Sequence, residues 1–238
     1  MLPVFVINLD RRPDRWTAMT AQLDRLRIEA MRIPGTDAGS IVGSIHDGLS
    51  LPQSGCRESH LVAVSAFLRT DAPASLILED DAELAPDVRR LLESVEWWPA
   101  GTNAIKLNCR RKALLLGRPI GATPHGSAIR PISWASAGAY AYMLNRAGAE
   151  IILNMSSSVG MTADSMLFHM PGSPIARRLK PSHVVPGIAR HADHFGSDNE
   201  GEFFPRTTGP AVRAVLKAGI CLRRLTGQVR RVEVPYRP

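Results

Sequence analysis

The sequence predicts an α/β fold in which a mostly parallel sheet is flanked by helices, with a basic helix at the C-terminal end. Short apolar, β-rich runs at 3–9 and 76–78 alternate with stretches that carry apolar residues at helical spacing. The opening strand–helix–strand pattern favours a right-handed crossover between parallel strands. The 238 residues are enough for one mid-sized domain with its own core.

The first 34 residues predict two strands joined by a helix. Residues 3–9, PVFVINL, form an apolar run typical of a buried strand. Pro13 suits the first turn of a helix, and apolar residues then follow at helical spacing, namely Trp16, Met19, Leu23 and Leu26. Residues 28–34 predict a second strand that ends at Pro34-Gly35.

The next part of the chain predicts a long loop followed by alternating helices and strands. Residues 35–54 are rich in Gly, Ser and Asp and predict a loop, after which a helix starts near Gly55. Residues 76–78 predict a third strand. Pro86 opens a helix that extends to about Val95, and residues 103–108 predict a fourth strand.

The second half is less regular in its pattern. Residues 110–131 are basic and interrupted by Gly and Pro, which predicts a loop. Residues 132–143 predict one or two strands, and a helix follows from Asn145, a good N-cap residue. The stretch 155–210 is rich in Pro, Gly and Ser and is predicted to be irregular. A final helix is predicted from Pro210 to about Leu225.

The net charge of +7 is confined to one end of the chain. Residues 205–238 hold eight of the 29 Lys and Arg residues and one acid, so they account for the whole excess. We therefore expect a domain at 1–208 and a basic amphipathic tail at 209–238. A neutral body with only 5% aromatic residues disfavours nucleic-acid binding.

Other global features predict a cytoplasmic protein. The three cysteines are far apart and lack zinc-type spacing, so we expect reduced thiols. The first residues differ from a secretory leader because their charges follow the short apolar run. No later run is long and apolar enough to span a bilayer.

Three consecutive acids, Glu79-Asp80-Asp81, come directly after the third predicted strand. They would leave the sheet at the carboxyl edge of its strands, where open α/β sheets bind ligands. Three adjacent carboxylates repel one another, and a divalent cation such as Mg²⁺ or Mn²⁺ is the simplest compensation. The alternative is a solvated strand end with Asp81 or Glu83 capping the next helix.

Several segments, taken in order, resemble glycosyltransferase family 25, a family of the GT-A type that includes lipooligosaccharide galactosyltransferases. The segments are VFVINLDRRPDRW near the start, GCRESH at 55–60, ILEDD followed by AELAPDVRRLL, AGAYAYMLNRAGAEIIL, Asp164 within MTADSMLF and, more weakly, FGSD at 195–198. The resemblance implies a GT-A-like, Rossmann-like sheet. In two places the chain departs from the family pattern: Met161-Thr162-Ala163 precede Asp164, and the loop after Lys106 is unusually basic.

The resemblance also implies roles for particular residues. Asp81 would bind the metal and Asp164 would be the general base that an inverting transfer needs; the alternative for Asp164 is acceptor binding or a helix cap. The remaining residues would contact the nucleotide sugar: Asn8, Arg11, Arg15, Ser59, His60, Glu79, Asp80 and Lys106. Solvated helix faces are the alternative for the arginines, a core hydrogen bond for His60, and simple exposure for Lys106.

The expected activity is inverting, metal-dependent transfer of a hexose, foremost galactose from UDP-galactose, to a lipopolysaccharide, lipooligosaccharide or other surface glycan. Two alternatives stay open: another UDP-sugar donor, or a non-catalytic sugar-nucleotide-binding module. A metal-dependent phosphoesterase is disfavoured because no clustered His and Asp ligands are visible.

The tail suggests a second partner, an anionic membrane surface on the inner face of the cytoplasmic membrane. A helix over 210–225 would place apolar residues on one broad face, namely Val212, Val215, Leu216, Leu222 and Leu225. Arg213, Lys217 and Arg224 would lie on the other face. The alternative is that the apolar face packs back on the domain.

Overall fold

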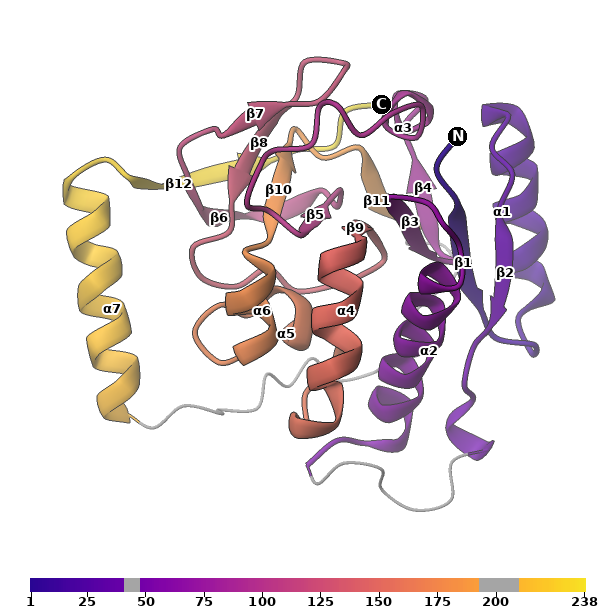
Figure 1. Cartoon of the computed structure of the whole chain (residues 1–238), viewed down its shortest axis with the longest axis horizontal. Helices are drawn as coiled ribbons and strands as arrows, with labels where there is room; N and C mark the ends of the chain where they lie inside the picture. The colour runs from indigo at the N-terminus through magenta and orange to yellow at the C-terminus, as the bar shows by residue number, and fades with distance from the viewer. Residues whose placement is uncertain (41–47, 193–209) are drawn as a thin grey trace.

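A computed structural model describes residues 1–40, 48–192 and 210–238 (Figure 1). Its centre is an eight-stranded sheet with the order β2-β1-β3-β9-β5-β10-β8-β7. The strands of this sheet are β1 (Val4–Asn8), β2 (Met31–Pro34), β3 (Ala74–Glu79), β5 (Ala104–Lys106), β7 (Gly121–Ala122), β8 (Ala128–Pro131), β9 (Ala141–Asn145) and β10 (Ser182–Val185). Two further pairs are β4 (Ala82–Leu84) with β11 (Ala189–His191), and β6 (Arg110–Gly117) with β12 (Val229–Val234).

Most strands of the central sheet run in one direction. β1 pairs in parallel with both β2 and β3, and β10 pairs in parallel with β5. β9 lies antiparallel between β3 and β5, so β5 shares the direction of β3. β8 is antiparallel to β10 and to β7. Within the described sheet, only β9 and β8 therefore run antiparallel to the other strands. This mostly parallel sheet confirms the predicted α/β class.

Helices bury both faces of the sheet. α2 (Leu51–Leu68), α4 (Arg146–Met155), α5 (Ala163–Phe168) and α6 (Pro174–Leu179) cover one face, and α1 (Pro13–Leu26) and α3 (Val88–Leu91) cover the other (Figure 1). Along β1, Phe5 and Ile7 enter the first core, whereas Val4 and Val6 enter the second. This alternation explains why the strand is apolar at every position.

The helix boundaries follow their capping residues. α2 begins at Leu51, four residues before the predicted start, because Ser50 and Gln53 form a reciprocal capping box. Asn145 caps α4 as predicted, its side chain accepting from the Gly148 amide. The helix predicted from Pro86 to Val95 is only the four-residue α3. Single turns of 3₁₀ helix lie at η1 (Ala38–Ser40) and η2 (Ser156–Ser158).

Two predicted irregular stretches contain strands. The predicted loop 110–131 holds β6, β7 and β8, and the predicted irregular stretch 155–210 holds β10, which lies inside the central sheet. Both predictions were wrong, and the second stretch also holds α5 and α6. β7 and β8 pair with each other locally, whereas β6 and β10 depend on distant partners. For β6 and β10 the partner strands β12 and β5 are far away in sequence, so no local pattern reveals them.

The predicted boundary between body and tail falls among residues outside the described ranges, as does the FGSD segment at 195–198. Beyond it, α7 (Pro210–Leu225) stands at the edge of the molecule and leads into β12 (Figure 1). Because β12 pairs with β6, this part of the tail is held against the body. Among the described residues, no helix combines the length and apolar character needed to cross a bilayer.

Candidate active site

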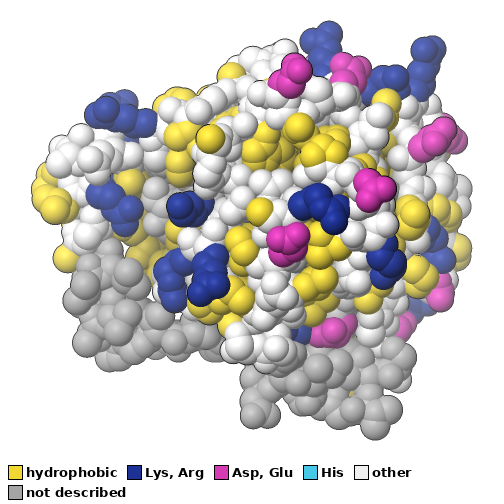
Figure 2. All heavy atoms as spheres, in the orientation of Figure 1, with side chains coloured by type: hydrophobic (Ala, Val, Ile, Leu, Met, Phe, Trp, Pro, Cys, Tyr) yellow, Lys and Arg dark blue, Asp and Glu magenta, His cyan; other side chains and the backbone are white. Residues whose placement is uncertain are grey.

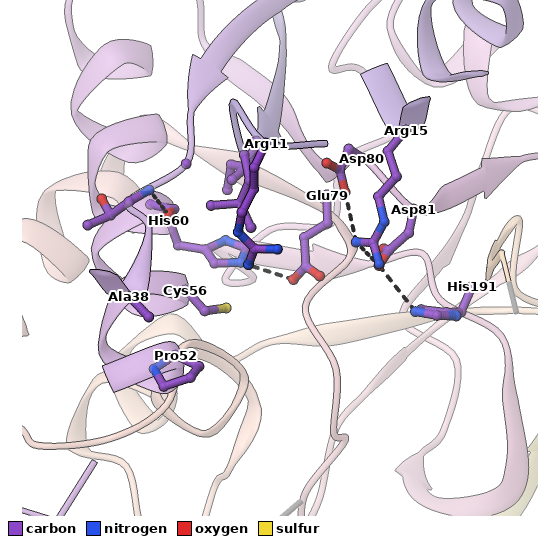
Figure 3. A pocket seen from close by; sticks show the side chains of 15 residues that line it. Arg11, Arg15, Ala38, Pro52, Cys56, His60, Glu79, Asp80, Asp81 and His191 are labelled. Atoms are coloured by element: carbon purple, nitrogen blue, oxygen red, sulfur yellow. Dashed lines mark hydrogen bonds and ion pairs between the residues drawn. The ribbon is translucent and has the colours of Figure 1, made fainter. Parts of the chain in front are cut away.

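A partly open pocket lies at the carboxyl ends of β1 and β3, against the N-terminal half of α2 (Figure 3). It encloses about 170 Å³. Small-molecule sites usually enclose about 300–1,000 Å³, so a nucleotide-sized ligand would extend through the open side. The pocket brings together seven of the predicted site residues, Arg11, Arg15, Ser59, His60, Glu79, Asp80 and Asp81.

The acids at the end of β3 are paired with a buried cation. Arg15, on the inner face of α1, is only 4% exposed. Its Nη1 lies 3.2 Å from Asp80 Oδ1 and 3.1 Å from Asp81 Oδ2. Arg15 therefore supplies part of the compensation that the sequence assigned to a metal. Neither Asp81 nor Glu83 caps the next helix, whose N-cap is Asp87, so that alternative is wrong.

Asn8 positions Asp80 and does not line the pocket. Its side-chain amide donates to Asp80 Oδ2 at 2.6 Å and to the Arg12 carbonyl at 3.0 Å, and its oxygen accepts from Arg32 Nε at 2.8 Å. Burial raises the pKa of Asp80, and the hydrogen bond from Asn8 opposes that rise. Asn8 therefore holds the acid in place, and its predicted contact with the nucleotide sugar stays a prediction.

His191 is a site residue that the sequence did not reveal. It lies at the end of β11, which pairs with β4 directly after the acids. Its Nε2 is 3.2 Å from Asp81 Oδ2, and its ring meets Tyr140 edge-on. A single histidine in a stretch predicted to be irregular gave no signal, because only the pairing of β11 with β4 brings it to Asp81.

Asp81 has the features of a ligand for a hard divalent cation. Its side chain is 8% exposed, and Oδ1 is buried without a hydrogen-bond partner among the described residues. A buried, unpaired carboxylate oxygen is costly unless a cation or donor group meets it. A carboxylate oxygen with a neighbouring carboxylate and imidazole suits Mn²⁺ or Mg²⁺. The residues present therefore fit the predicted metal.

The opposite wall of the pocket has a different chemistry. His60 is 1% exposed, with Nε2 3.1 Å from Glu79 Oε1 and Nδ1 3.1 Å from the Tyr142 hydroxyl. Cys56 lies one helical turn before His60 on α2. Burial, and then the negative charge of Glu79, raise the pKa of the Cys56 thiol well above its usual range. The Glu79 carboxylate is 29% exposed, far more than those of the two aspartates.

Ser59 and Arg11 shape the rim of the pocket. The Ser59 hydroxyl donates to the Gly55 carbonyl at 2.7 Å and accepts from the Thr36 amide at 2.8 Å, which fixes the chain after β2 against α2. Gly55 is required here, since a Cβ would lie 2.4 Å from the Thr36 carbonyl oxygen. Arg11 Nε pairs with Asp37 at 2.8 Å. The backbone amide of Gly39 and then Arg11 lower the pKa of Asp37.

Lys106 is buried away from the pocket lining. Its Nζ donates to the carbonyls of Ser136 and Ala137, at 2.6 Å each, and lies 4.6 Å from the centre of the Phe168 ring. Burial lowers the pKa of Lys106 well below its usual range, and the charge of Asp164 opposes that change. Lys106 holds the carbonyls of residues 136 and 137, and the alternative of simple exposure is wrong because its side chain is fully buried. Its predicted contact with a phosphate of the nucleotide sugar stays a prediction.

Asp164 also holds this loop. One carboxylate oxygen accepts from the Gly138 amide at 2.9 Å, and the other accepts from the Thr162 hydroxyl at 2.6 Å and the Ser165 amide at 2.7 Å. Asp164 lies in the first turn of α5 and does not line the pocket. Asp164 thus satisfies the Ser165 amide in the first turn of α5, although the N-cap itself is Thr162. Its predicted role as the general base stays a prediction.

Comparison of the sequence with known proteins identifies a family. The sequence profile of glycosyltransferase family 25, described as an LPS biosynthesis protein, matches residues 1–167. No curated protein sequence matches the chain.

Two solved structures align with the chain at low similarity. A glycosyltransferase involved in the glycosylation of the major capsid of PBCV-1 aligns with a TM-score of 0.41 at 6% identity, over 92% of this chain and 99% of that one. A mannose-1-phosphate geranyltransferase from Thermus thermophilus aligns with a TM-score of 0.32 at 14% identity, over 98% of this chain and 68% of that one. Because both TM-scores are low, the family profile alone carries the assignment.

Proposed function

The chain belongs to glycosyltransferase family 25, and from this premise we propose that it transfers a hexose, foremost galactose from UDP-galactose, to a lipopolysaccharide or lipooligosaccharide precursor. A nucleotide sugar as donor and a glycan as acceptor follow from the family. The particular sugar, the lipopolysaccharide acceptor, inversion of the anomeric configuration and use of Mn²⁺ or Mg²⁺ are the proposal.

One observation carries this proposal: a carboxylate oxygen without a partner at the edge of the pocket. Asp81 Oδ1 is buried and unpaired among the described residues, while Oδ2 is held by Arg15 and His191. An acid that is fixed through one oxygen and open through the other is arranged to bind a ligand. A non-catalytic sugar-nucleotide-binding module would need no such fixed acid.

Different residues around the pocket would bind the metal, position the aspartates and contact the donor. Asp81 and His191 would hold a divalent cation, which when bound supplies positive charge to the diphosphate leaving group. Arg15 and Asn8 keep the two aspartates in place. Arg11, 49% exposed at the rim, can reach a phosphate or ribose outside the enclosed volume. Glu79, the most exposed of the three acids, faces the donor sugar.

The decisive experiment measures donor binding and slow donor hydrolysis with a panel of sugar nucleotides. We expect UDP-galactose, with Mn²⁺, to raise the melting temperature and to be hydrolysed faster than UDP-glucose or UDP-N-acetylglucosamine. A stronger response to another UDP-sugar would replace galactose and keep the reaction class. Binding of several donors without hydrolysis or transfer would favour the non-catalytic module.

We also propose that α7 holds the protein at the inner face of the cytoplasmic membrane. Leu222 and Leu225 are 64% and 86% exposed, beside the exposed Arg223 and Arg224. Figure 2 shows basic and apolar side chains together at this edge of the molecule. Ile220, in contrast, is buried, so one side of the helix packs on the body as the alternative requires. Exposed leucines next to arginines suit shallow insertion into an anionic surface.

A further inference from the structure

We propose that Cys56, His60 and Glu79 form a second cation site, selective for a soft divalent ion of the Zn²⁺ type and distinct from the oxygen-rich site at Asp81. One ligand atom from each residue lies within 4.8 Å of those of the other two. The three side chains come from α2 and from the end of β3, and they turn toward the same space in Figure 3.

The spacing of the three ligand atoms is close to that of a bound zinc ion. With Zn–S of about 2.3 Å and Zn–N and Zn–O of about 2.0 Å, ligand atoms in a tetrahedral site are about 3.5 Å apart. The separations here, within 4.8 Å, need a closure of at most about 1.3 Å. Cys56 and Glu79 can supply it by side-chain rotation, because Cys56 is half-buried and Glu79 is 29% exposed.

His60 is already oriented for this task. Metal-bound histidines usually use one ring nitrogen for the metal and the other for a hydrogen bond that fixes the ring. His60 Nδ1 is held by the Tyr142 hydroxyl at 3.1 Å, and Tyr142 is fully buried. Nε2 is then the nitrogen that faces Glu79, at 3.1 Å. A cation would replace this direct contact by bonds to both groups.

The choice of metal follows from the ligand chemistry. Thiolate and imidazole favour Zn²⁺ over Mn²⁺ or Mg²⁺, whose preferred ligands are oxygens. Binding would displace the thiol proton of Cys56, since the metal binds the thiolate. The opposite wall offers the oxygens of Asp80 and Asp81 with the single imidazole of His191, and no sulfur, so the thiolate is what distinguishes the two sets of ligands. The two walls of the pocket would therefore select different cations.

Occupation of this site has a consequence for turnover, and only this consequence depends on the proposed function. Glu79 and His60 line the pocket in which the nucleotide sugar would bind. A cation held by them would change the charge and shape of that wall. We expect Zn²⁺ to inhibit transfer at concentrations at which Mn²⁺ supports it.

The test is titration with Co²⁺, whose bond to a thiolate gives an intense near-ultraviolet absorption that oxygen ligands do not give. We expect this band to saturate at one equivalent in the wild-type chain and to be displaced by Zn²⁺. Cys56→Ser, a nearly isosteric change, should abolish the band. Cys109→Ser and Cys221→Ser are the matched controls and should keep it, because those thiols lie outside the cluster.

The variant Tyr142→Phe distinguishes a metal-binding site from three side chains that only pack together. Loss of a partner that orients a ligand costs about 10–100-fold in metal affinity, so we expect weaker Co²⁺ binding with the band retained. Absence of the band in the wild-type chain, or its persistence in Cys56→Ser, would overturn the proposal. Neither readout needs a sugar nucleotide, so failure of the proposed function would leave them unchanged.

Discussion

Two polar regions that contain predicted site residues differ in how many of their polar atoms have hydrogen-bond partners within the chain. At the acid edge, Asp81 keeps one buried oxygen without a partner and faces a cavity. At the inner cluster, formed by Lys106, Asp164 and His183, Lys106 donates to two carbonyls and Asp164 accepts three hydrogen bonds. His183 lies opposite Lys106 on the neighbouring strand; its Nδ1 donates to the Val184 carbonyl, and its Nε2 has no partner among the described residues. Charged residues that are satisfied internally stabilise the fold, whereas one left open at a cavity is available to a ligand.

The largest expected effect tests the acid edge. Asp81→Asn keeps the shape of the side chain and removes the charge that would hold the cation. Loss of one electrostatic contact to the developing charge costs about 10²–10³-fold in turnover, and we expect a loss of at least that size with cooperative unfolding retained. Transfer from the preferred UDP-sugar with Mn²⁺ measures it, and Asp71→Asn, at an exposed acid, is the control. Activity near that of the wild type would exclude Asp81 from metal binding.

Lys106→Met tests the inner cluster. The change leaves the carbonyls of Ser136 and Ala137 without their donor, and each unsatisfied buried group costs about 1–3 kcal/mol. Relief from burying the ammonium group offsets part of this, so we expect the free energy of unfolding to fall by about 2 kcal/mol. Urea denaturation measures it. Donor affinity should stay unchanged at a temperature where the variant is folded, and a selective loss of affinity would support the predicted phosphate contact.

The pH dependence of stability tests the same cluster. Burial and the positive charge of Lys106 lower the pKa of His183 from 6.5 to about 3. The unfolded chain therefore takes up a proton below about pH 6.5 that the folded chain does not. Stability should be fully present above that pH and fall by about 2 kcal/mol between pH 7 and pH 5 from this residue alone. Urea midpoints at both pH values, compared with those of His183→Gln, measure it; an equal dependence in the variant would contradict this role.

The variant Asp164→Asn distinguishes a structural role of this acid from a role as the general base. The amide still accepts through one oxygen but loses the charge near the N-terminus of α5, which is typically worth about 0.3–1 kcal/mol. We expect a loss of about 1 kcal/mol in unfolding free energy and little change in turnover of the folded protein. Thermal unfolding and transfer assays measure the two effects together. A large loss of turnover at unchanged stability would instead identify Asp164 as the general base.

The last comparison concerns α7, which stands at the edge of the molecule (Figure 1) and contributes to neither polar region. Leu222→Ser with Leu225→Ser removes exposed apolar surface without changing charge. We expect weaker sedimentation with anionic vesicles at low salt, by roughly tenfold, and no effect on transfer to a water-soluble acceptor. Arg223→Gln with Arg224→Gln should weaken binding further, since each basic residue contributes about 1 kcal/mol. Equal sedimentation of wild type and both variants, or no preference for anionic over neutral lipid, would contradict the membrane proposal.

The sequence by itself determined the features that depend on residues close to one another along the chain. Apolar runs predicted β1 and β3, helical spacing predicted α1, and Asn145 predicted the start of α4. The acids after β3 predicted a polar edge, because the residue that follows a buried strand must emerge at the end of the sheet. The ordered motifs also identified the family, which the profile match confirms.

Tertiary structure alone decided what each polar group contacts. His191 reaches Asp81 because β11 pairs with β4, and Lys106 turns into the core because carbonyls of residues 136 and 137 lie beside it. Asn8 and Arg15 were predicted to contact the nucleotide sugar, and only the packing of β1 and α1 against β3 made them partners of the acids. The physical reason is that a charged side chain is satisfied by whichever group the fold brings within about 3 Å, and that group lies anywhere along the chain.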